Sequence, residues 1–505
     1  MSRKQLFFFV GTIVLLLVGR FMLAGTGYLD DQDELLYLWM SDHFQESTQL
    51  SFWVGGVTQM QGQPPEMIIR ALEYWSLLPV AHALGKQPLH PDVLYFVGLY
   101  NILVSVLILY VFFCICRKLL FSVEHAILGM FLLGTLVNFN IYTRHILPYD
   151  HALLIHLLAL NLLLRKEANL RDVLLAGSLS AIALTWYMGE FVFVVINGSF
   201  LIFSSWNNRS RLWKKLFLFG GPFVLLVLIY ELCMQWEGKS YLGFIANYST
   251  TVYMASFDEG FTYFFIYFWQ VEKWWGMLLV VIAFFGITRT VFNRQAIPNV
   301  KALLSIAILA YIAYGAYVYF GHKMVFHGRI LHIYFPFVII GVLVMLQQLK
   351  GGLASISIPL LFIGALVNYY FIIQDFKQIG YPRNFIYQNQ LFSQQGKVEL
   401  ECYEEMASPV HYCDRASWRI DSIGSTNLDS GKYILSNICF NIHYPDSEII
   451  EYPAYRLQSG DTCIKDQLHF QSHPAYVFEY CDRSGRELYL KKKLMLKIVK
   501  LQSKR

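Results

Sequence analysis

The chain has 505 residues, of which 56% are hydrophobic and only 15% are charged. Because soluble domains carry about 25% charged residues, this composition excludes a soluble enzyme, a disordered chain and a coiled coil. The net charge of +5 is small for this length and argues against a nucleic-acid-binding protein.

Eleven apolar segments are predicted to cross the membrane as helices, since most of them approach the length of about 20 residues that a bilayer requires. The first, residues 6–24, is interpreted as a retained span, because no convincing cleavage site for a signal peptidase ends it. The sequence therefore predicts a polytopic α-helical membrane protein. The eleven segments are 6–24, 93–115, 124–142, 149–164, 173–187, 190–204, 215–234, 275–292, 302–320, 330–347 and 353–373.

The distribution of basic residues supports this number of spans through the positive-inside rule. If the N-terminus is cytoplasmic, the inner loops are rich in Lys and Arg, as at Arg3 and Lys4, at Arg117 and Lys118, and over residues 209–215. The outer loops are longer in total and hold fewer basic residues. An odd number of spans then places the chain after residue 375 outside the cytoplasm.

A large outer loop, residues 25–92, follows the first span and begins with a cluster of acids. Asp30, Asp31, Asp33 and Glu34 put four carboxylates into five residues at the outer membrane surface. Such a cluster suits a general base that removes a proton from an acceptor hydroxyl or amine. The alternative is a solvated turn at the interface.

The next outer loop is short and concentrates ionisable residues between two spans. It contains Arg144, His145, Asp150 and His151. Ionisable residues at membrane depth are functional candidates, and the basic members of this group are predicted to position an acceptor. In the alternative interpretation, Asp150 caps the fourth span and both histidines are interfacial residues. A divalent metal ion is a further alternative that the sequence does not favour.

Three cations are predicted on the same side of the membrane as these acids. Arg20 lies about one turn from the outer end of the first span, and Lys323 and Arg329 flank a short outer loop. Arginine is well suited to bind a phosphate through two hydrogen bonds. Carboxylates and cations at one leaflet fit a nucleophile that a carboxylate activates and a lipid phosphate that leaves. The alternative is that these cations reach towards lipid head groups.

Two further outer segments have recognisable patterns. Residues 66–83 of the first outer loop are predicted to be helical, because apolar residues recur at helical spacing. Residues 235–274 are rich in aromatic side chains and are predicted to form a belt at the membrane interface. The alternative for this second segment is the wall of a site for a lipid or a sugar.

The composition changes after Phe376, where polar residues, Pro and Cys appear and no further span follows. The chain is therefore divided into a multi-span membrane catalytic domain, residues 1–375, and an extracytoplasmic α+β domain, residues 376–505. Residues 432–438 are predicted to form a strand, and residues 475–490 a β-hairpin.

These features together resemble the GT-C glycosyltransferases, and in particular the branch that uses polyprenyl-phosphate sugars. That branch includes the protein O-mannosyltransferases and the lipid A aminoarabinose transferases. Its Asp-Glu pair after the first span matches Asp33 and Glu34, and its acid in the second outer loop corresponds best to Asp150. Residues 329–336 are similar to its late Arg-Tyr-Leu-x-Pro segment, from which His332 departs. The resemblance covers the membrane part of the chain.

The resemblance implies an inverting transfer of a sugar from a polyprenyl-phosphate donor. The acceptor would be an envelope glycan such as lipopolysaccharide, a lipid or a protein on the extracytoplasmic face. Asp33, or Asp30 or Asp31 in its place, would take the proton of the acceptor. Asp150 would position the acceptor or share this role.

The resemblance also implies how the leaving phosphate is held. Arg329, with Lys323 or Arg20, would bind the phosphate and stabilise its charge. Enzymes of this branch typically need no metal ion, so no cofactor is expected. The scarcity of glycosylation sequons and the compact loops favour a bacterial inner membrane, with a cytoplasmic N-terminus and a periplasmic C-terminal domain.

Three alternative functions remain at this point, and one of them, a structural or scaffolding membrane protein, would leave the acid cluster unexplained. A lipid-linked glycan polymerase or ligase would work at the same face, but such proteins favour Arg-rich loops over a carboxylate cluster. A membrane transporter is less favoured, because it predicts internal repeats and charges near the bilayer midplane. Here the charges are predicted at the outer ends of the spans.

Overall fold

The computed structural model describes most of the membrane part of the chain and short pieces of the remainder. The described residues are 1–24, 76–86, 91–144, 148–165, 168–206, 209–236, 238, 240–243, 245–246, 259–321, 328–349, 352–378, 400–402, 433–435, 451–452, 455–456, 478 and 498–500.

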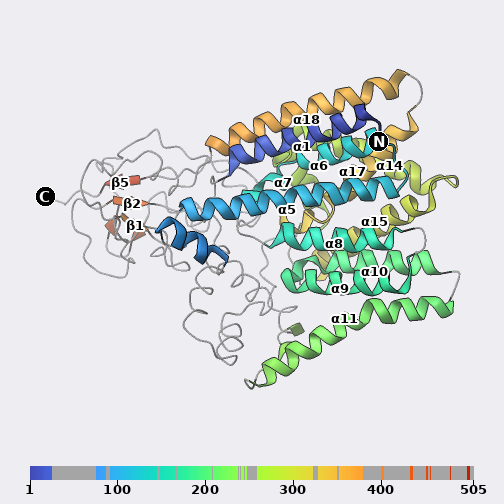
Figure 1. The fold of residues 1–505 in the computed structure, drawn as a ribbon, viewed down its shortest axis with the longest axis horizontal. Helices are drawn as coiled ribbons and strands as arrows, with labels where there is room; N and C mark the ends of the chain where they lie inside the picture. Colours follow the sequence, from blue (N-terminus) through green and yellow to red (C-terminus); the bar gives the residue numbers. More distant parts are fainter. Residues whose placement is uncertain are drawn as a thin grey trace.

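Long helices lie side by side with their axes roughly aligned and form one bundle (Figure 1). Each of the eleven segments predicted to span the membrane overlaps at least one helix. In the part of the chain that the structure describes, 7 helices are long and apolar enough to cross a bilayer, and three further apolar helices are shorter. The polytopic helical fold is thus confirmed, whereas eleven crossings stay a prediction.

The helices follow the chain in an order close to that of the predicted spans. Residues 76–84 are also helical, which confirms the described part of the helix predicted over residues 66–83; residues 66–75 lie outside the described residues. The helices are α1 (Arg3–Leu23), α5 (Pro91–Lys118), α6 (Val123–Gly134), α7 (Asn138–Ile141), η1 (Tyr142–Arg144), α8 (Tyr149–Leu163), α9 (Leu170–Trp186), η2 (Met188–Glu190), α10 (Phe191–Ser205), α11 (Arg209–Gln235), α13 (Thr262–Gln270), α14 (Lys273–Phe292), α15 (Pro298–Gly321), α16 (Gly328–Leu331), α17 (Phe335–Gln348) and α18 (Gly352–Gln378).

Side-chain caps define where two of these helices begin. Ser2 and Gln5 at the start of α1 each accept a hydrogen bond from the backbone N–H of the other. Asn169 and Asp172 form the same reciprocal pair at the start of α9. Each pair satisfies N–H groups that a helix start leaves without an intrahelical acceptor.

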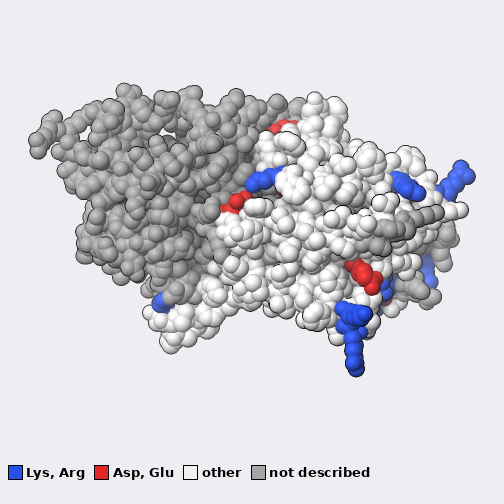
Figure 2. All heavy atoms as spheres, turned by 90° about the horizontal axis from the view of Figure 1, so that it is seen from above, with Lys and Arg blue, Asp and Glu red and all other residues white. Residues whose placement is uncertain are grey.

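Charges are unevenly distributed along the bundle. On the face shown in Figure 2, most Lys and Arg side chains stand at one end, and the flank that leads away from it carries few charges. This is the end at which the chain begins (Figure 1). The distribution is that of a protein whose long flank faces lipid. The cytoplasmic location of the basic end stays a prediction.

Glycines allow some helices to approach each other closely. A Cβ atom added to Gly286 of α14 would lie 2.1 Å from the backbone oxygen of Gly341 in α17. A Cβ atom added to Gly177 of α9 would lie 2.4 Å from the backbone oxygen of Phe219 in α11. Small residues are the usual means by which helices pack in membranes. In contrast, the outward face of α11 exposes large apolar side chains, as contact with lipid requires.

Two predicted spans are interrupted, and the prediction of a continuous helix is wrong for both. The segment 124–142 contains α6, then a break at residues 135–137, and then α7 and η1. The segment 330–347 lies on α16 and α17, which a turn at residues 332–334 separates. Backbone that leaves the helix inside a membrane protein must find hydrogen-bond partners within the protein. The two breaks face each other, because Nδ1 of His332 lies 2.5 Å from Oδ1 of Asn138.

The strands of the described chain all lie in its C-terminal part. The central strand β2 pairs in parallel with β1 and antiparallel with β5, and β3 pairs antiparallel with β4. Figure 1 places β1, β2 and β5 beyond the end of the bundle that is opposite the N-terminus. The strands are β1 (Leu400–Cys402), β2 (Tyr433–Leu435), β3 (Glu451–Tyr452), β4 (Tyr455–Arg456) and β5 (Ile498–Lys500).

These strands test part of the prediction for the C-terminal domain. β2 lies within the strand predicted over residues 432–438. Phe478 has helical backbone, so the hairpin predicted over residues 475–490 is wrong at this residue. The rest of the predicted α+β domain lies outside the described residues. Helix α18 continues to Gln378, and the division of the chain at residue 375 stays a prediction.

Candidate active site

Buried polar residues gather at the end of the bundle opposite the N-terminus. The last turn of α1, the break after α6 and the first turn of α8 lie at this end (Figure 1). The contacts of His332 with Asp150 and Asn138 place the turn between α16 and α17 beside them. Three residues that the sequence analysis assigned to one site come from these elements, namely Arg20, Asp150 and Arg329. Asp150 interacts electrostatically with Arg20, and Arg329 binds the neighbouring Tyr149. The structure therefore brings these three together.

His332 links Asp150 to Asn138 in the centre of this site. Its Nε2 lies 3.0 Å from Oδ1 of Asp150, and its Nδ1 lies 2.5 Å from Oδ1 of Asn138. Asn138 donates from Nδ2 to the hydroxyl of Tyr267 at 2.9 Å and to the backbone oxygen of Gly328 at 3.2 Å. His332 and Asn138 are 0% exposed and Asp150 is 3% exposed, so this network is sealed from solvent.

The contacts of Asn138 determine that Nδ1 of His332 carries a hydrogen. The backbone oxygen of Gly328 can only accept, so Asn138 presents its nitrogen to Gly328 and its oxygen to His332. Nδ1 of His332 therefore carries a hydrogen. Nε2 faces Oδ1 of Asp150 at 3.0 Å, a close contact between the two side chains that is not a hydrogen bond in this structure.

Side chains bind the backbone groups that the break after α6 releases. The two carboxylate oxygens of Glu272 accept from the N–H groups of Val137 and Asn138, both at 2.9 Å. Glu272 thereby fixes the start of α7, and with it the position of Asn138. The released carbonyl oxygens accept from side-chain amides, those of Gly134 and Leu136 from Asn140 and that of Thr135 from Asn368.

Replacing Glu272 by Gln is expected to destabilise this break. An amide offers only one acceptor oxygen, so its NH2 group would face a backbone N–H, and a buried donor left without an acceptor costs about 1–3 kcal/mol. Burial raises the pKa of Glu272 to about 7, against the effect of the two N–H groups. Thermal unfolding in one detergent, at about pH 8 where the carboxylate is ionised, measures the difference.

The control for this prediction is Glu231→Gln. Glu231 also accepts a backbone N–H, that of Leu242 at 2.8 Å, but this bond is exposed. Water can replace an exposed acceptor, so the control variant should unfold close to the temperature of the wild type. Equal losses in both variants would show that Glu272 does not hold the break.

Arg329 reaches the site from α16. Its Nη1 donates to the hydroxyl of Tyr149, and its guanidinium carbon lies 5.2 Å from the centre of the Tyr149 ring. Tyr149 precedes Asp150 in the first turn of α8, and its ring packs edge to face on Tyr142. The ring of Tyr142 in turn packs edge to face on His332. Aromatic side chains thus connect this cation to the Asp150–His332 pair.

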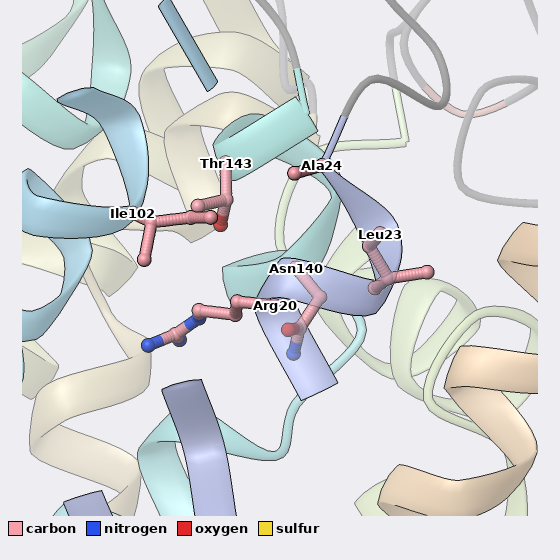
Figure 3. A pocket seen from close by; sticks show the side chains of 6 residues that line it. All are labelled: Arg20, Leu23, Ala24, Ile102, Asn140 and Thr143. Atoms are coloured by element: carbon pink, nitrogen blue, oxygen red, sulfur yellow. The ribbon is translucent and has the colours of Figure 1, made fainter. Parts of the chain in front are cut away.

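Arg20 is buried in the last turn of α1 beside a pocket. Its Nη2 donates to the backbone oxygen of Gly134 at 3.5 Å, whereas Nε and Nη1 have no hydrogen-bond partner among the described residues. A buried cation is costly unless an anion or hydrogen-bond acceptors compensate it, so this one is suited to an anionic ligand. The pocket is small and is lined by Arg20, Leu23, Ala24, Ile102, Asn140 and Thr143 (Figure 3).

The remaining predicted site residues are only partly placed. His151 is buried, with its ring stacked 5.3 Å from that of Tyr100 and 6.2 Å from that of Trp186. Arg144 ends η1, and its side chain is not described. Their acceptor-positioning roles stay predictions. The residues outside the described part of the chain are Asp30, Asp31, Asp33, Glu34, His145 and Lys323.

The interpretation of Asp150 as a helix cap is wrong. The N-cap residue of α8 is Pro148, and no side chain caps this helix start. Asp150 lies in the first turn, with its carboxyl group directed to His332 and not to the backbone N–H groups of α8. Its burial therefore needs another explanation, which the pairing with His332 provides.

A second buried acid–histidine pair lies beneath the first. Nε2 of His156 lies 3.7 Å from Oε2 of Glu190, and both side chains are 0% exposed. Asn197 donates to the backbone oxygen of His156 at 3.4 Å. Glu190 also interacts electrostatically with Asp150. Within the described ranges, no group of three or more His, Cys, Asp and Glu side chains is arranged to hold a metal ion.

Sequence reasoning missed three residues that build the site. Asn138 and Glu272 were not identified, and His332 was noted only as a departure from a family pattern. Asn138 and Asn140 are polar positions in a segment predicted as a continuous span. Such positions could have indicated the break, since side-chain amides in a membrane helix usually bind backbone or other helices.

No protein-family profile matches the sequence, and no curated protein sequence matches it. The structure is similar to the crystal structure of ArnT from Cupriavidus metallidurans bound to undecaprenyl phosphate. The TM-score is 0.54, over 90% of this chain and 98% of that chain. The chain has the GT-C fold. The sequence identity is 11%, so the similarity is one of fold. The resemblance predicted from the sequence is confirmed at that level.

Helices from distant parts of this fold bring the buried residues of the site together at one end of the bundle. One end of the bundle holds a buried acid–imidazole pair, a guanidinium that contacts a tyrosine ring and a second guanidinium beside a pocket. An acid–imidazole pair can exchange a proton with a bound hydroxyl or amine. Guanidinium groups bind a phosphate and stabilise the charge that develops on it. The site is therefore equipped for both halves of a group transfer.

Proposed function

We propose that this chain is an integral-membrane glycosyltransferase that moves a sugar from a polyprenyl-phosphate donor to an acceptor, with inversion at the anomeric carbon. The observation that carries the proposal is the buried Asp150–His332 pair beside Arg20 and Arg329 in a chain with the GT-C fold. The similar crystal structure holds undecaprenyl phosphate, which supports a lipid of this class as the carrier of the sugar.

The proposed reaction forms one bond and breaks another at the anomeric carbon. The acceptor oxygen or nitrogen attacks this carbon, and the bond from the carbon to the phosphate oxygen breaks with its electron pair on the phosphate. The proton of the acceptor passes to Asp33, or to Asp30 or Asp31. Asp150 positions the acceptor or shares the base role, since an Asp150 carboxylate beside an imidazolium keeps lone pairs for an incoming hydroxyl.

The leaving phosphate would be held by cations. Arg329, with Lys323 or Arg20, balances the negative charge that grows on the phosphate as the bond breaks. Arg20 has donors directed away from its one hydrogen bond in the described structure. With cations in this role, the reaction requires no metal ion, and none is proposed.

The proposed acceptor and membrane are named by class. The acceptor is an envelope glycan such as lipopolysaccharide, a lipid or a protein, and transfer takes place on the extracytoplasmic face. The membrane is the inner membrane of a bacterium, with the N-terminus in the cytoplasm. The concentration of Lys and Arg at the end of the bundle away from Asp150 supports this orientation (Figures 1 and 2).

The decisive experiment is a transfer assay with purified protein in lipid vesicles. Radiolabelled sugars on undecaprenyl phosphate or dolichyl phosphate are supplied together with bacterial envelope glycans, lipids and proteins. We expect label to move from one donor into one acceptor class, with release of the lipid phosphate. Failure with every donor, in membranes that also contain lipid-linked glycan chains, would overturn the proposal and leave a glycan polymerase or ligase as the better candidate.

Replacing Arg329 by Ala is expected to lower kcat by about 10²–10³-fold, because removal of one well-placed donor to a developing anion has an effect of this size. Arg329→Lys keeps the charge but loses the planar pair of donors, so its kcat should fall between those of the wild type and the Ala variant. Steady-state transfer rates at saturating donor measure both effects.

Arg289→Ala is the matched control for this prediction. Arg289 lies in the last turn of α14 and is exposed. Glu272, which contacts the site, is the N-cap residue of α14. Arg289 is in the last turn of the same helix and therefore lies at the opposite end of the bundle. Its removal should leave kcat unchanged. A similar loss in both arginine variants would remove Arg329 from the phosphate site.

A further inference from the structure

We propose that Phe478, from the C-terminal part of the chain, is a positioning residue for the Asp150–His332 pair. The role of that pair in transfer rests on the proposed function. The contacts that connect Phe478 to the pair are observed directly, and they cross from the C-terminal part of the chain into the helical bundle.

Phe478 is held on α13 by both its ring and its backbone. Its ring lies 5.5 Å from the ring of Tyr263 and 5.5 Å from that of Tyr267, close to edge on in each case. Its carbonyl oxygen accepts a hydrogen bond of 2.8 Å from the hydroxyl of Tyr263. Phe478 is 1% exposed, so this contact is a buried one.

The two tyrosines are presented to Phe478 by the geometry of α13. Tyr263 and Tyr267 are four residues apart in a helix and therefore lie on one face. Both are 0% exposed, although exposed rings of the same helix, such as Phe265 and Trp269, lie on other faces. Other side chains must cover this buried aromatic face, and Phe478 is one of the residues that pack on it.

Tyr267 connects Phe478 to the site, because it contacts both Phe478 and Asn138. Its hydroxyl accepts from Nδ2 of Asn138 at 2.9 Å, and Oδ1 of Asn138 lies 2.5 Å from Nδ1 of His332. Because Nδ2 of Asn138 donates to the backbone oxygen of Gly328, its Oδ1 faces Nδ1 of His332, which therefore carries a hydrogen. Nε2 of the same ring then faces Asp150 at 3.0 Å. A shift of the Tyr267 ring therefore acts on the imidazole ring that contacts Asp150.

Burial makes this connection stiff. Asn138, His332 and Tyr267 are each 0% exposed, and close-packed interiors transmit displacements because few voids can absorb them. Removing the Phe478 ring leaves a cavity against Tyr267, towards which this ring can relax. The hydrogen bond to Asn138 then lengthens or turns, and the Asp150–His332 pair loses its single arrangement.

The first test compares Phe478→Ala with Phe112→Ala. Phe112 is a 0% exposed ring of α5 outside the chain of contacts from Phe478 to Asp150, so its loss is a matched loss of packing. We expect Phe478→Ala to lower kcat about tenfold while the KM for donor stays within about twofold, as for coupling between contacting networks. Phe478→Leu, which refills most of the cavity, should restore most of kcat.

Phe112→Ala is expected to lower the unfolding temperature without this selective loss of kcat. The inference is overturned if both Ala variants lose kcat equally, or if Phe478→Ala transfers sugar at the wild-type rate. Either result would mean that Phe478 contributes packing only.

A second measurement does not depend on transfer activity. Protein labelled with ¹³C-histidine is studied by NMR without substrate, and the His332 signal is assigned by its loss in His332→Gln. Phe478→Ala and Tyr267→Phe should move this signal, and Phe112→Ala should not. If the signal moves but the wild type transfers no sugar, the proposed function fails and the positioning role stands. If sugar is transferred and the signal stays in place, the positioning role fails alone.

Discussion

Replacing Asp150 by Asn is expected to lower kcat for sugar transfer by about 10²–10⁴-fold, the range for loss of a positioned acid–base group. The amide cannot take a proton, and it also removes the partner that faces Nε2 of His332 at 3.0 Å. The KM for donor should change little, because the phosphate is held by arginines. Initial rates over a range of donor concentrations separate the two parameters.

The matched control is Asp172→Asn. Asp172 is buried to a similar degree, at 4% exposed against 3% for Asp150, but it belongs to the cap of α9. Loss of a buried carboxylate there should lower thermal stability and leave kcat within a small factor of the wild type. Transfer by Asp150→Asn at the wild-type rate would show that the Asp150–His332 pair is a structural feature and not part of the site.

Replacing Asp33 by Asn is expected to have an effect of the same size, about 10²–10⁴-fold on kcat, because Asp33 is the proposed base for the acceptor. Asp30→Asn, Asp31→Asn and Glu34→Gln are the matched variants within the same cluster. They remove one charge each, so they share any general electrostatic effect with Asp33→Asn. Transfer rates of the four variants under saturating donor make the comparison.

The outcome of this series assigns the base. A large loss in Asp30→Asn or Asp31→Asn, with Asp33→Asn active, would move the base to that residue. Full activity in all four variants would leave Asp150 as the base. If Asp33 and Asp150 share the role, the double variant should lose little more than the worse single variant, since residues that act as a unit are not additive.

The site shows which parts of such an arrangement can be read from a sequence. Arg20, Asp150 and Arg329 were assigned to one site from the side of the membrane on which each was predicted to lie, and the structure brings them together. Sidedness follows from counting spans and basic loops, which are local properties of the chain. The pairing of His332 with Asn138 could not be found in this way, because the two residues are 194 positions apart in the chain.

The breaks in two predicted spans illustrate the same limit. Hydrophobicity over residues 124–142 predicts a continuous helix, and Asn138 and Asn140 indicate polar positions in it without fixing its end at Gly134. The break persists because Glu272, 134 residues beyond Asn138, accepts the N–H groups that it releases. A local pattern can indicate a polar position in a span. Only the packed structure supplies the acceptor for the backbone N–H groups that a break in the helix releases.

The aromatic segment over residues 235–274 was interpreted from composition alone, and its described part differs from a belt at the interface. Tyr263 and Tyr267 are 0% exposed and contact Phe478, which follows Tyr263 by 215 residues. Exposed rings in the same helix, Phe265 and Trp269, keep the character expected at a membrane surface. Composition cannot distinguish the two sets, because both consist of large aromatic residues.

The sequence by itself determined that this is a polytopic helical membrane protein and where most of its long helices lie. These properties depend on the length of apolar runs and on charge counts, which each segment carries alone. Only the tertiary structure decided that Asp150 pairs with His332, that Glu272 holds a helix open and that Phe478 reaches this network. Such contacts join distant segments, and their geometry is set by how the whole bundle packs.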